Sequence, residues 1–488
     1  MHQHLRYLVR ATALGLALTS SAGATDLEDV LNAARDADPE FAAAQRTWQA
    51  DQQAVKQGRG ALMPSINAQY SHVRSDQTLE DAPVAVAPGD PEQTTDADQD
   101  FDLQTTTVSV VQPLFRPEAW YSYTQGKALT SVGEARFEQA RQDFLLRVAQ
   151  RYTEVLRTWD NLLAARAAER AFSRQLDQTR ERFDVGLVPI TDLHEAQAAR
   201  DLGTVNRIVA ESDFSVARNN LEAFTGMSLD SIDGLAAEIP ISGPQPADPE
   251  AWVERALAAN PSLLAARYQA DAAKATARQG LSRQLPTVDL VGQYQHQHYL
   301  DEGFYDPFNT GRGGQNVRGN SIGVEVNIPL FAGGALNSQR LQSSYQYQAT
   351  EEQYRLTHRN ISQNARSLTQ VVAANAQRVG ARRQALVSAK SVLQATQSGY
   401  EVGTRNAVDL LNAQQRLFQA QSDYANARYD YILDSLRLKA LAGMLTEQDI
   451  LEINGWLSAS VTVRMEAPAQ GVEASTQAEA DGNNAANP

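Results

Sequence analysis

The sequence contains no cysteine, so we expect neither a disulfide nor a lipid attached to an N-terminal cysteine. Beyond the N-terminal residues, no apolar run approaches the length of a membrane-spanning helix. Basic residues are in the minority: 43 Lys and Arg face 58 Asp and Glu, which gives a net charge of −15 and argues against nucleic-acid binding. Any attachment to a membrane would have to come from strands or from partner proteins.

The first residues have the pattern of an export signal. Arg6 and Arg10 precede an apolar stretch over residues 11–18, and Ala22-Gly23-Ala24 supplies small residues for cleavage. We interpret residues 1–24 as a signal peptide and expect an exported protein. An uncleaved anchor is the less favoured alternative, because the apolar stretch is shorter than a transmembrane helix.

The chain is internally duplicated. Residues 183–227 recur at 400–444 with one unbroken offset, and each copy has a glycine at its turn, Gly186 and Gly403. Polar residues that can start the next helix follow in both copies: Thr191 and Asp192 in the first, Asn406 in the second. A helix that closes on glycine and is followed by such residues predicts a tight antiparallel helix hairpin.

The duplication extends upstream, so each half is predicted to contain a helix, two strands, a long helix and a shorter helix. A proline lies at every predicted junction of strand and helix: Pro64, Pro113, Pro286 and Pro329. In the first repeat, 25–248, we predict strands at 64–77 and 101–114 and helices at 118–185 and 191–225. In the second repeat, 249–465, we predict strands at 286–299 and 317–330 and helices at 334–402 and 407–441. Residues 466–488 lack periodicity and predict a disordered acidic tail.

The predicted strands alternate between apolar and polar residues. In the fourth, Ile322, Val324 and Val326 share one face, with Glu325 and Asn327 on the other. This pattern is typical of a membrane barrel with a wet lumen, although the strands alone leave an ordinary half-exposed sheet open. Acidic segments with Gly and Pro, typical of external loops, favour the barrel: Thr78–Asp100 and Asp301–Asn316. Because membrane barrels begin at about eight strands, four strands per chain require an oligomer.

The long helices limit the architecture further. A continuous helix over 118–185 would extend roughly 100 Å, more than any globular core requires. Residues at strict seven-residue spacing, apolar except for Glu169, predict a coiled-coil seam in each half. The two series are Ala365, Val372, Val379, Leu386, Leu393 and Tyr400, and Val148, Val155, Leu162, Glu169, Leu176 and Phe183.

No nucleophile, base or cofactor motif is recognisable, so we expect neither an enzyme nor a cofactor. His296 and His298 lie two apart on one strand face, and a hydrated barrel rim or aromatic girdle is favoured there over a metal site. The sequence therefore predicts a structural or transport protein.

With these features in hand, the chain resembles the TolC family of outer-membrane export ducts. The most specific stretches are Val185-Gly186-Leu187-Val188-Pro189-Ile190-Thr191-Asp192, Val402-Gly403-Thr404-Arg405, and Ala425-Asn426-Ala427-Arg428-Tyr429. The resemblance implies an α+β membrane protein: a homotrimer with a twelve-stranded β-barrel in the outer membrane, four strands from each chain, continued by a long helical coiled-coil barrel across the periplasm. It also implies a mixed region at 228–248 and 445–463.

The resemblance further implies a passive duct for type I protein secretion, multidrug efflux or both. Energy would come from an inner-membrane pump or ABC transporter, and a periplasmic adaptor would dock between the helices of the tip. The residues that match the family's periplasmic gate are Tyr400, Arg405, Thr191 and Asp192. For the two hairpin carboxylates, Asp192 and Asp409, the alternative role is stabilisation of a helix N-terminus.

Charge at the tip departs from the family pattern. Relatives often carry two aspartates three residues apart, and here Asp409 fills the first place while Asn412 fills the second. Glu195 stands at the position equivalent to Asn412 in the other repeat. If Glu195 faces the pore, the second negative charge lies on the first hairpin and is not lost. These three residues are our candidates for pore selectivity.

Two rival classes remain. A periplasmic coiled-coil adaptor or scaffold of an export system would also have long hairpins and an export signal, but it would not need four amphipathic strands that meet helices at prolines. An enzyme built on a membrane barrel would have no use for helices of roughly 100 Å.

Overall fold

The structure is a computed structural model that describes residues 24–84, 93–300 and 316–465. The predicted signal peptide, apart from its last residue, lies outside the described residues. So do the predicted tail at 466–488 and all but the last residue of the predicted loop at 301–316.

The chain divides into two compact units. The first comprises residues 1–43, 140–260 and 361–488, and the second comprises residues 44–139 and 261–360. Each unit draws on both halves of the chain, so the units do not coincide with the sequence repeats. Within the described ranges, no helix is both long and apolar enough to cross a bilayer.

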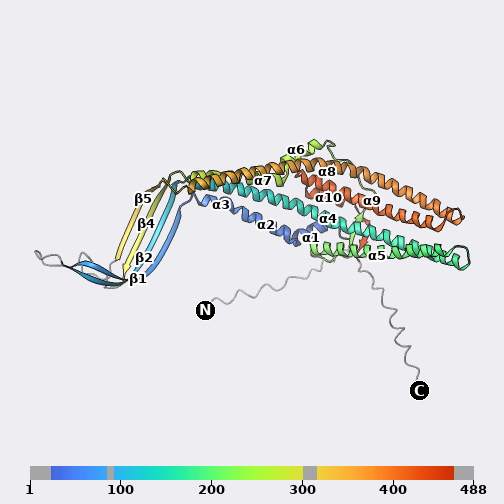
Figure 1. The fold of residues 1–488 in the computed structure, drawn as a ribbon, viewed down its shortest axis with the longest axis horizontal. Coiled ribbons are helices and arrows are strands. Elements are labelled where there is room, and N and C mark those ends of the chain that lie inside the picture. The colour runs from blue at the N-terminus through green and yellow to red at the C-terminus, as the bar shows by residue number, and fades with distance from the viewer. Residues whose placement is uncertain (1–23, 85–92, 301–315, 466–488) are drawn as a thin grey trace, which may run out of the picture. The chain divides into compact units, whose positions relative to one another are not determined.

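The second unit contains a four-stranded antiparallel sheet in the order β1-β2-β4-β5 (Figure 1). The strands are β1 (Ser65–Val84), β2 (Gln93–Phe115), β4 (Thr287–Tyr299) and β5 (Asn316–Asn327). Three of the predicted junction prolines flank strands: Pro64, Pro286 and Pro329. Pro113 instead lies inside β2, where the pairing with β4 shifts register before Phe115. Proline lacks an N–H group, so it ends or interrupts a strand ladder at these points.

The β1–β2 hairpin is longer than predicted. We expected strands at 64–77 and 101–114 joined by a loop over Thr78–Asp100, but the two strands stay paired as far as Val84 and Gln93. Thr78 Oγ1 donates to Asp98 at 2.8 Å within this extension. Apolar alternation marks where a sheet faces a nonpolar environment, whereas strand length follows backbone pairing, which polar residues continue equally well.

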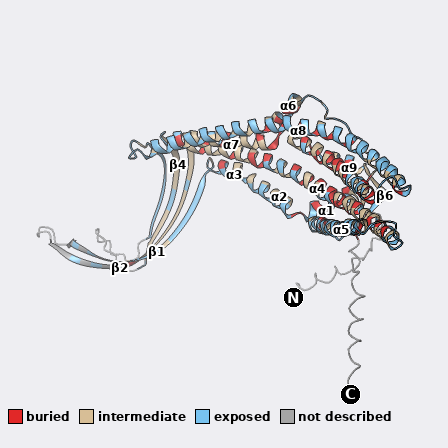
Figure 2. Ribbon diagram, turned by 45° about the vertical axis from the view of Figure 1, so that its right-hand side comes forward, coloured by how far each residue is buried: buried red, intermediate tan, exposed pale blue. Residues whose placement is uncertain are grey.

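The sheet has one apolar face. The register places Val324 beside Leu290 and Val326 beside Val288 on β5 and β4, and Ile66 beside Val110 on β1 and β2. In the single chain this face is open: Ile66 is 70% exposed and Ile322 is 81% exposed. Figure 2 shows the strands as mostly exposed or intermediate, in contrast to the buried segments of the helices. The opposite face carries polar residues such as Asn67, Gln293 and Glu325.

Four long or medium helices lie close to their predicted bounds. They are α4 (Pro117–Asp184), α5 (Ile190–Thr225), α8 (Ala335–Glu401) and α9 (Ala407–Leu441). The seam residues of both series are buried or intermediate; Val148 and Val155 are fully enclosed, and Val372 and Val379 are 2% exposed. The seven-residue spacing therefore identified the packing faces of α4 and α8.

The shorter helices are broken where we had expected continuous ones. The segment before β1 forms α1 (Leu27–Ala37), α2 (Pro39–Asp51) and α3 (Gln53–Gly60), and the equivalent segment forms α6 (Pro249–Ala259) and α7 (Pro261–Ser282). Asp38 and Asn260 precede prolines and adopt extended backbone with ψ near 109° and 120°. A residue before proline disfavours the helical region, so each helix ends there and a new one begins.

The predicted mixed region forms a small two-stranded sheet in the first unit. Its strands are β3 (Ser231–Leu235) and β6 (Leu457–Arg464), with α10 (Glu447–Asn454) preceding β6. The main apolar core lies around these elements and includes Leu27, Tyr152, Ile232, Ile432 and Ile450. Tyr152 donates its hydroxyl to the carbonyl oxygen of Asp233 at 2.7 Å, which joins α4 to the small sheet.

The duplicated stretches 183–227 and 400–444 each end next to a glycine with left-handed backbone, Gly226 (φ 68°) and Gly443 (φ 69°). A side chain there costs about 1 kcal/mol or more in backbone strain alone. A methyl group on Gly443 would also overlap the carbonyl oxygen of Ala259, whereas one on Gly226 would meet only Ala37 Cβ, at 3.3 Å.

We therefore expect Gly443→Ala to lower the thermal midpoint of the purified protein clearly more than the matched substitution Gly226→Ala. Thermal unfolding in detergent, followed by circular dichroism, measures both. Equal shifts would show that the contact with Ala259 adds nothing to the backbone strain.

Candidate functional site

The two helix hairpins end in the same kind of turn. Gly186 and Gly403 have φ of 76° and 79°. The amide of Leu187 donates to the carbonyl oxygen of Arg182 at 2.8 Å, and Thr404 donates in the same way to Gly399 at 2.8 Å. This is the hydrogen bond of a Schellman motif, in which glycine takes the left-handed position after the helix.

The helices that follow the turns start differently in the two hairpins. Asn406 caps α9, because its side chain accepts from the amide of Asp409 at 2.7 Å. In the first hairpin the cap position is Pro189, with no side-chain hydrogen bond, and α5 begins at Ile190. Thr191 and Asp192 therefore lie in the first turn of α5, and our expectation that they start the helix was wrong. Proline fixes φ near the helical value, so the helix can start without a polar cap.

Tyr400 joins the two hairpins. Its side chain is 8% exposed, and its hydroxyl accepts a hydrogen bond from Gln175 Nε2 of α4 at 3.3 Å. The same amide nitrogen of Gln175 lies 3.2 Å from Thr179 Oγ1. The guanidinium carbon of Arg182 lies 4.7 Å from the centroid of the Tyr400 ring, within the range of a cation–π interaction. Tyr400 is thus held by a buried polar chain and a cation.

The other predicted gate residues make contacts within their own hairpins. Arg405 Nη1 lies 3.7 Å from Asp409 Oδ2, one helical turn along the same chain segment. Thr191 Oγ1 lies 3.5 Å from the carboxylate of its neighbour Asp192. Among the described residues of this single chain, the structure therefore brings Tyr400, rather than Arg405, against the other hairpin.

Gln175 and Arg182 were missed by sequence reasoning. Gln175 and Thr179 are one helical turn apart on α4 and are 3% and 0% exposed. Two polar residues one turn apart, close to the predicted seam, could have indicated a buried polar contact, because a buried side-chain amide requires a partner. Their partner is 225 residues away in the sequence, which no local pattern indicates.

A groove lies between the hairpins in the first unit. It has a volume of ≈ 580 Å³ and is bounded by α4, α5 and α9. Small and apolar residues form much of its surface, among them Ala168, Ala199 and Leu411. Glu195 and Asn412, which we had paired by repeat position, line this same groove.

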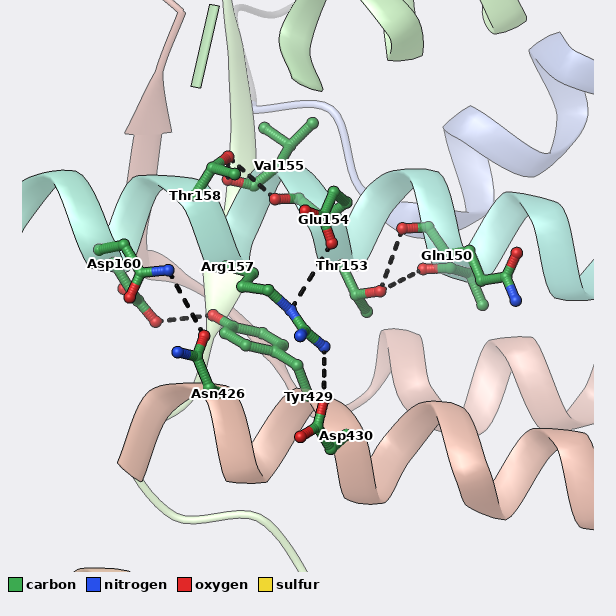
Figure 3. A network of polar contacts seen from close by, with 12 residues as sticks. Gln150, Thr153, Glu154, Val155, Arg157, Thr158, Asp160, Asn426, Tyr429 and Asp430 are labelled. Carbon is green, nitrogen blue, oxygen red and sulfur yellow. Dashed lines mark hydrogen bonds and ion pairs between the residues drawn. The ribbon is translucent and has the colours of Figure 1, made fainter. Parts of the chain in front are cut away.

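A second polar network lies between α4 and α9, farther from the hairpin turns (Figure 3). Tyr429 donates its hydroxyl to Asp160 at 2.8 Å, and Arg157 pairs with Asp430 at 2.8 Å. Burial raises the pKa of Asp160, although the hydrogen bond from Tyr429 and the nearby Arg428 guanidinium act in the opposite direction. Burial and the adjacent Asp160 raise the pKa of Tyr429 well above its ordinary value. The network fixes one helix against the other and offers no reactive group to a substrate.

Taken together, an amphipathic antiparallel sheet, long paired helices and polar turns at the helix tips define a class of protein, the outer-membrane channel-tunnels. The chain matches the family model described as "Outer membrane efflux protein" over residues 30–227 and 252–444. The chain belongs to this family, and it is an outer-membrane export channel.

Relatives cover nearly the whole chain. It is 33% identical over 449 residues to the outer membrane protein TolC of Vibrio cholerae serotype O1, covering 92% of this chain and 97% of the relative. It is 29% identical to the alkaline protease secretion protein AprF of Pseudomonas aeruginosa, covering 89% and 88% of the two chains. The fold is similar to that of the CmeC outer membrane channel of Campylobacter jejuni, with a TM-score of 0.71, 15% identity and coverage of 92% and 95%.

The raised pKa of Asp160 gives a pH-dependent prediction. A carboxyl group whose folded-state pKa is raised contributes fully to stability below its unfolded-state pKa, and this contribution is lost as pH rises through the folded-state pKa. Asp160→Asn keeps an acceptor for Tyr429 without a charge. The thermal midpoint of this variant, relative to that of the unsubstituted protein, should therefore increase as pH rises. Asp160→Ala leaves the Tyr429 hydroxyl unpaired and should destabilise by about 1 to 3 kcal/mol.

Thermal unfolding over a range of pH measures this, with Asp201→Asn as the control, because Asp201 is exposed and pairs only with the neighbouring Arg200 in the contacts recorded for it. A loss of stability in Asp160→Asn that grows with pH would mean that the cationic neighbours outweigh burial.

Proposed function

We propose that three copies of the chain assemble into a passive exit duct, gated at the helix tips and opened when a periplasmic adaptor and an inner-membrane pump or ABC transporter dock. The cargo is protein, small molecules or both. Relatives named for protease secretion and for efflux support this breadth. The observation that carries the proposal is the sheet with two open edges.

The edges of the sheet favour a closed ring of copies. β1 and β5 each have one neighbour within the chain, and all adjacent strands are antiparallel. Four alternating strands leave β1 and β5 running in opposite directions, so β5 of one copy can pair with β1 of the next and continue the antiparallel pattern. An edge in the apolar part of a membrane would leave backbone groups unpaired at several kcal/mol each, which closure avoids.

The helical unit also has an unpartnered face. Leu202, Val205, Val209 and Val216 lie along one side of α5, each more than half exposed in the single chain. Their spacing of three, four and seven residues is that of a packing stripe. Burial of this stripe against a neighbouring copy would stabilise the assembly through the hydrophobic effect.

The state of assembly is tested by mass. In detergent, native mass spectrometry should give the mass of three chains, because three copies supply the twelve strands of the barrel. Val205→Glu with Val209→Glu should shift the population toward monomer, since two charges would then lie in the helix interface. A stable monomer, or a dimer with eight strands, in the unsubstituted protein would contradict the proposed duct.

For the gate, we propose that Tyr400, held by Gln175 and Arg182, keeps the second hairpin against the first. Arg405, Thr191 and Asp192 lie at the exposed turns and are proposed to complete the closure between copies. Removal of one partner from a partly buried polar network costs more than an exposed ion pair contributes. On opening, contacts with the docked adaptor would replace these few contacts. The groove between α5 and α9 provides space for the adaptor.

The gate proposal predicts a leak. The double variant Tyr400→Phe with Arg405→Ser removes the acceptor for Gln175 and the partner of Asp409, so the closed-state conductance should rise severalfold in planar bilayers. The control is Arg200→Ser, which removes an arginine paired with its neighbour Asp201 on α5. Conductance of the double variant equal to that of the unsubstituted channel would exclude this network as the gate.

For pore selectivity, we propose that Asp409 forms a ring of three carboxylates in the assembled tip. Its pairing with Arg405 would offset part of that charge while the gate is closed. Glu195 would supply a negative charge in the groove, where Asn412 is neutral. This assignment rests on the trimer, since a single chain has no ring.

The main alternative, a periplasmic adaptor or scaffold, is disfavoured by the apolar face of the sheet, which has no role in a water-filled compartment. Fractionation separates the two: a duct sediments with the outer membrane and resists a salt wash, whereas an adaptor is released.

A further inference from the structure

The apolar face of the sheet ends in a row of cationic and imidazole side chains. On β5, apolar residues occupy every second position from Val326 to Ile322, and Asn320 and Arg318 follow. On β4 the same face carries Tyr294 and then His296 and His298. The register places Arg318 directly opposite His296, and His298 opposite Asn316. We call Arg318, His296 and His298 the rim cluster.

The rim cluster lies at the depth expected for lipid headgroups. Ile328, just past β5 at the end nearest α8, and Arg318 are about ten residues apart, or roughly 34 Å along a strand. At a tilt of about 40° this corresponds to roughly 26 Å along the membrane normal, close to the apolar thickness that barrels present to lipid. Tyr294, one step closer to the apolar band, is the residue type enriched at that boundary.

Among the described residues, the rim cluster has no ion-pair partner, unlike the neighbouring cations on the same face. Arg74 pairs with Asp100 at 2.7 Å, and His72 lies 3.8 Å from Asp102, both across β1 and β2. Within the described part of the chain, Arg318 has neither an ion-pair partner nor a side-chain hydrogen bond recorded for it, and it is exposed. His296 Nε2, in contrast, is buried, and it has no hydrogen-bond partner among the described residues. His298 Nδ1 lies 2.5 Å from Asn316 Oδ1, which orients the ring.

We propose that the rim cluster binds a phosphate group of a lipid headgroup in the outer leaflet. A guanidinium presents paired N–H donors that match phosphate oxygens, and residues directly opposite on paired strands have Cβ atoms about 5 Å apart. Arg318 and His296 can therefore converge on one phosphate, with His298 one row further from the apolar band. Because β5 is an edge strand, the bound lipid would lie at the seam between copies, and this placement rests on the proposed trimer.

The experiment is native mass spectrometry of the full-length channel in detergent, titrated with diphosphoryl lipid A. We expect retention of the lipid on the assembled protein, with clearly weaker retention of a neutral diacylglycerol. Arg318→Gln together with His296→Gln should weaken lipid A binding roughly ten- to hundredfold, as expected for loss of charge-assisted hydrogen bonds. Inorganic phosphate at the same concentration should not bind or displace the lipid, because the acyl chains contribute much of the affinity.

The matched control is Arg74→Gln, which removes an arginine from the same face that is already paired with Asp100. Arg318→Lys, which keeps the charge but loses the paired donors, should bind with intermediate affinity and serves if the glutamine variant fails to assemble. Lipid A binding unchanged in both Arg318 variants, or weakened equally by Arg74→Gln, would overturn the proposal. The same spectra report the number of chains, so a failure of the trimer is distinguished from a trimer whose rim cluster does not bind lipid.

Discussion

Backbone hydrogen bonding at the edges of the four-stranded sheet is the constraint on which the rest of the structure depends. A sheet with an apolar face is stable in a nonpolar environment. In that environment an unpaired N–H or C=O group cannot form a hydrogen bond with water. β1 and β5 are the edges of the four-stranded sheet in the described part of the chain, so the proposed assembly of copies would pair the groups that these edges leave open. The helices have a similar feature, because the stripe on α5 is more than half exposed in the part of the chain that the structure describes. Both features favour the same solution, a ring of identical copies.

Inside the helical unit, buried polar groups fix how the helices align. A coiled-coil seam of Val and Leu at seven-residue spacing tolerates sliding by one heptad at modest cost, because each position resembles the next. Tyr429 with Asp160, and Tyr400 with Gln175, do not tolerate it, since a slip would leave a hydroxyl or an amide buried without a partner. The raised pKa of Asp160 shows that burial acts on this carboxyl group despite its hydrogen bond. Such contacts favour one alignment more than they add to total stability.

Much of the fold could be predicted because glycine and proline mark its boundaries. The ends of α4 and α8 and the starts of α5 and α9 follow from Gly186, Gly403 and the residues around them. We had expected one continuous helix over 26–60 and another over 249–283, but Pro39 and Pro261 each start a new helix within these segments. The outer part of the β1–β2 hairpin was missed for a different reason: its polar residues carry no apolar alternation, and only the pairing itself holds them.

The candidate site was less predictable, because contacts between distant helices decide it. The resemblance named Tyr400 as a gate residue, and that role stays a proposal; the contacts of Tyr400 with Gln175 and Arg182 of α4 were not foreseen. The comparison of repeats did better with Glu195 and Asn412, which line one groove. Since the acid and the amide occupy the same groove of the same chain, exchange of the two residue types between the repeats would leave its total charge unchanged. Duplicated hairpins can therefore lose a charge in one copy and keep it in the other, as long as both copies border the same space. If this groove borders the pore, as proposed above, the charge at the tip depends on both positions together.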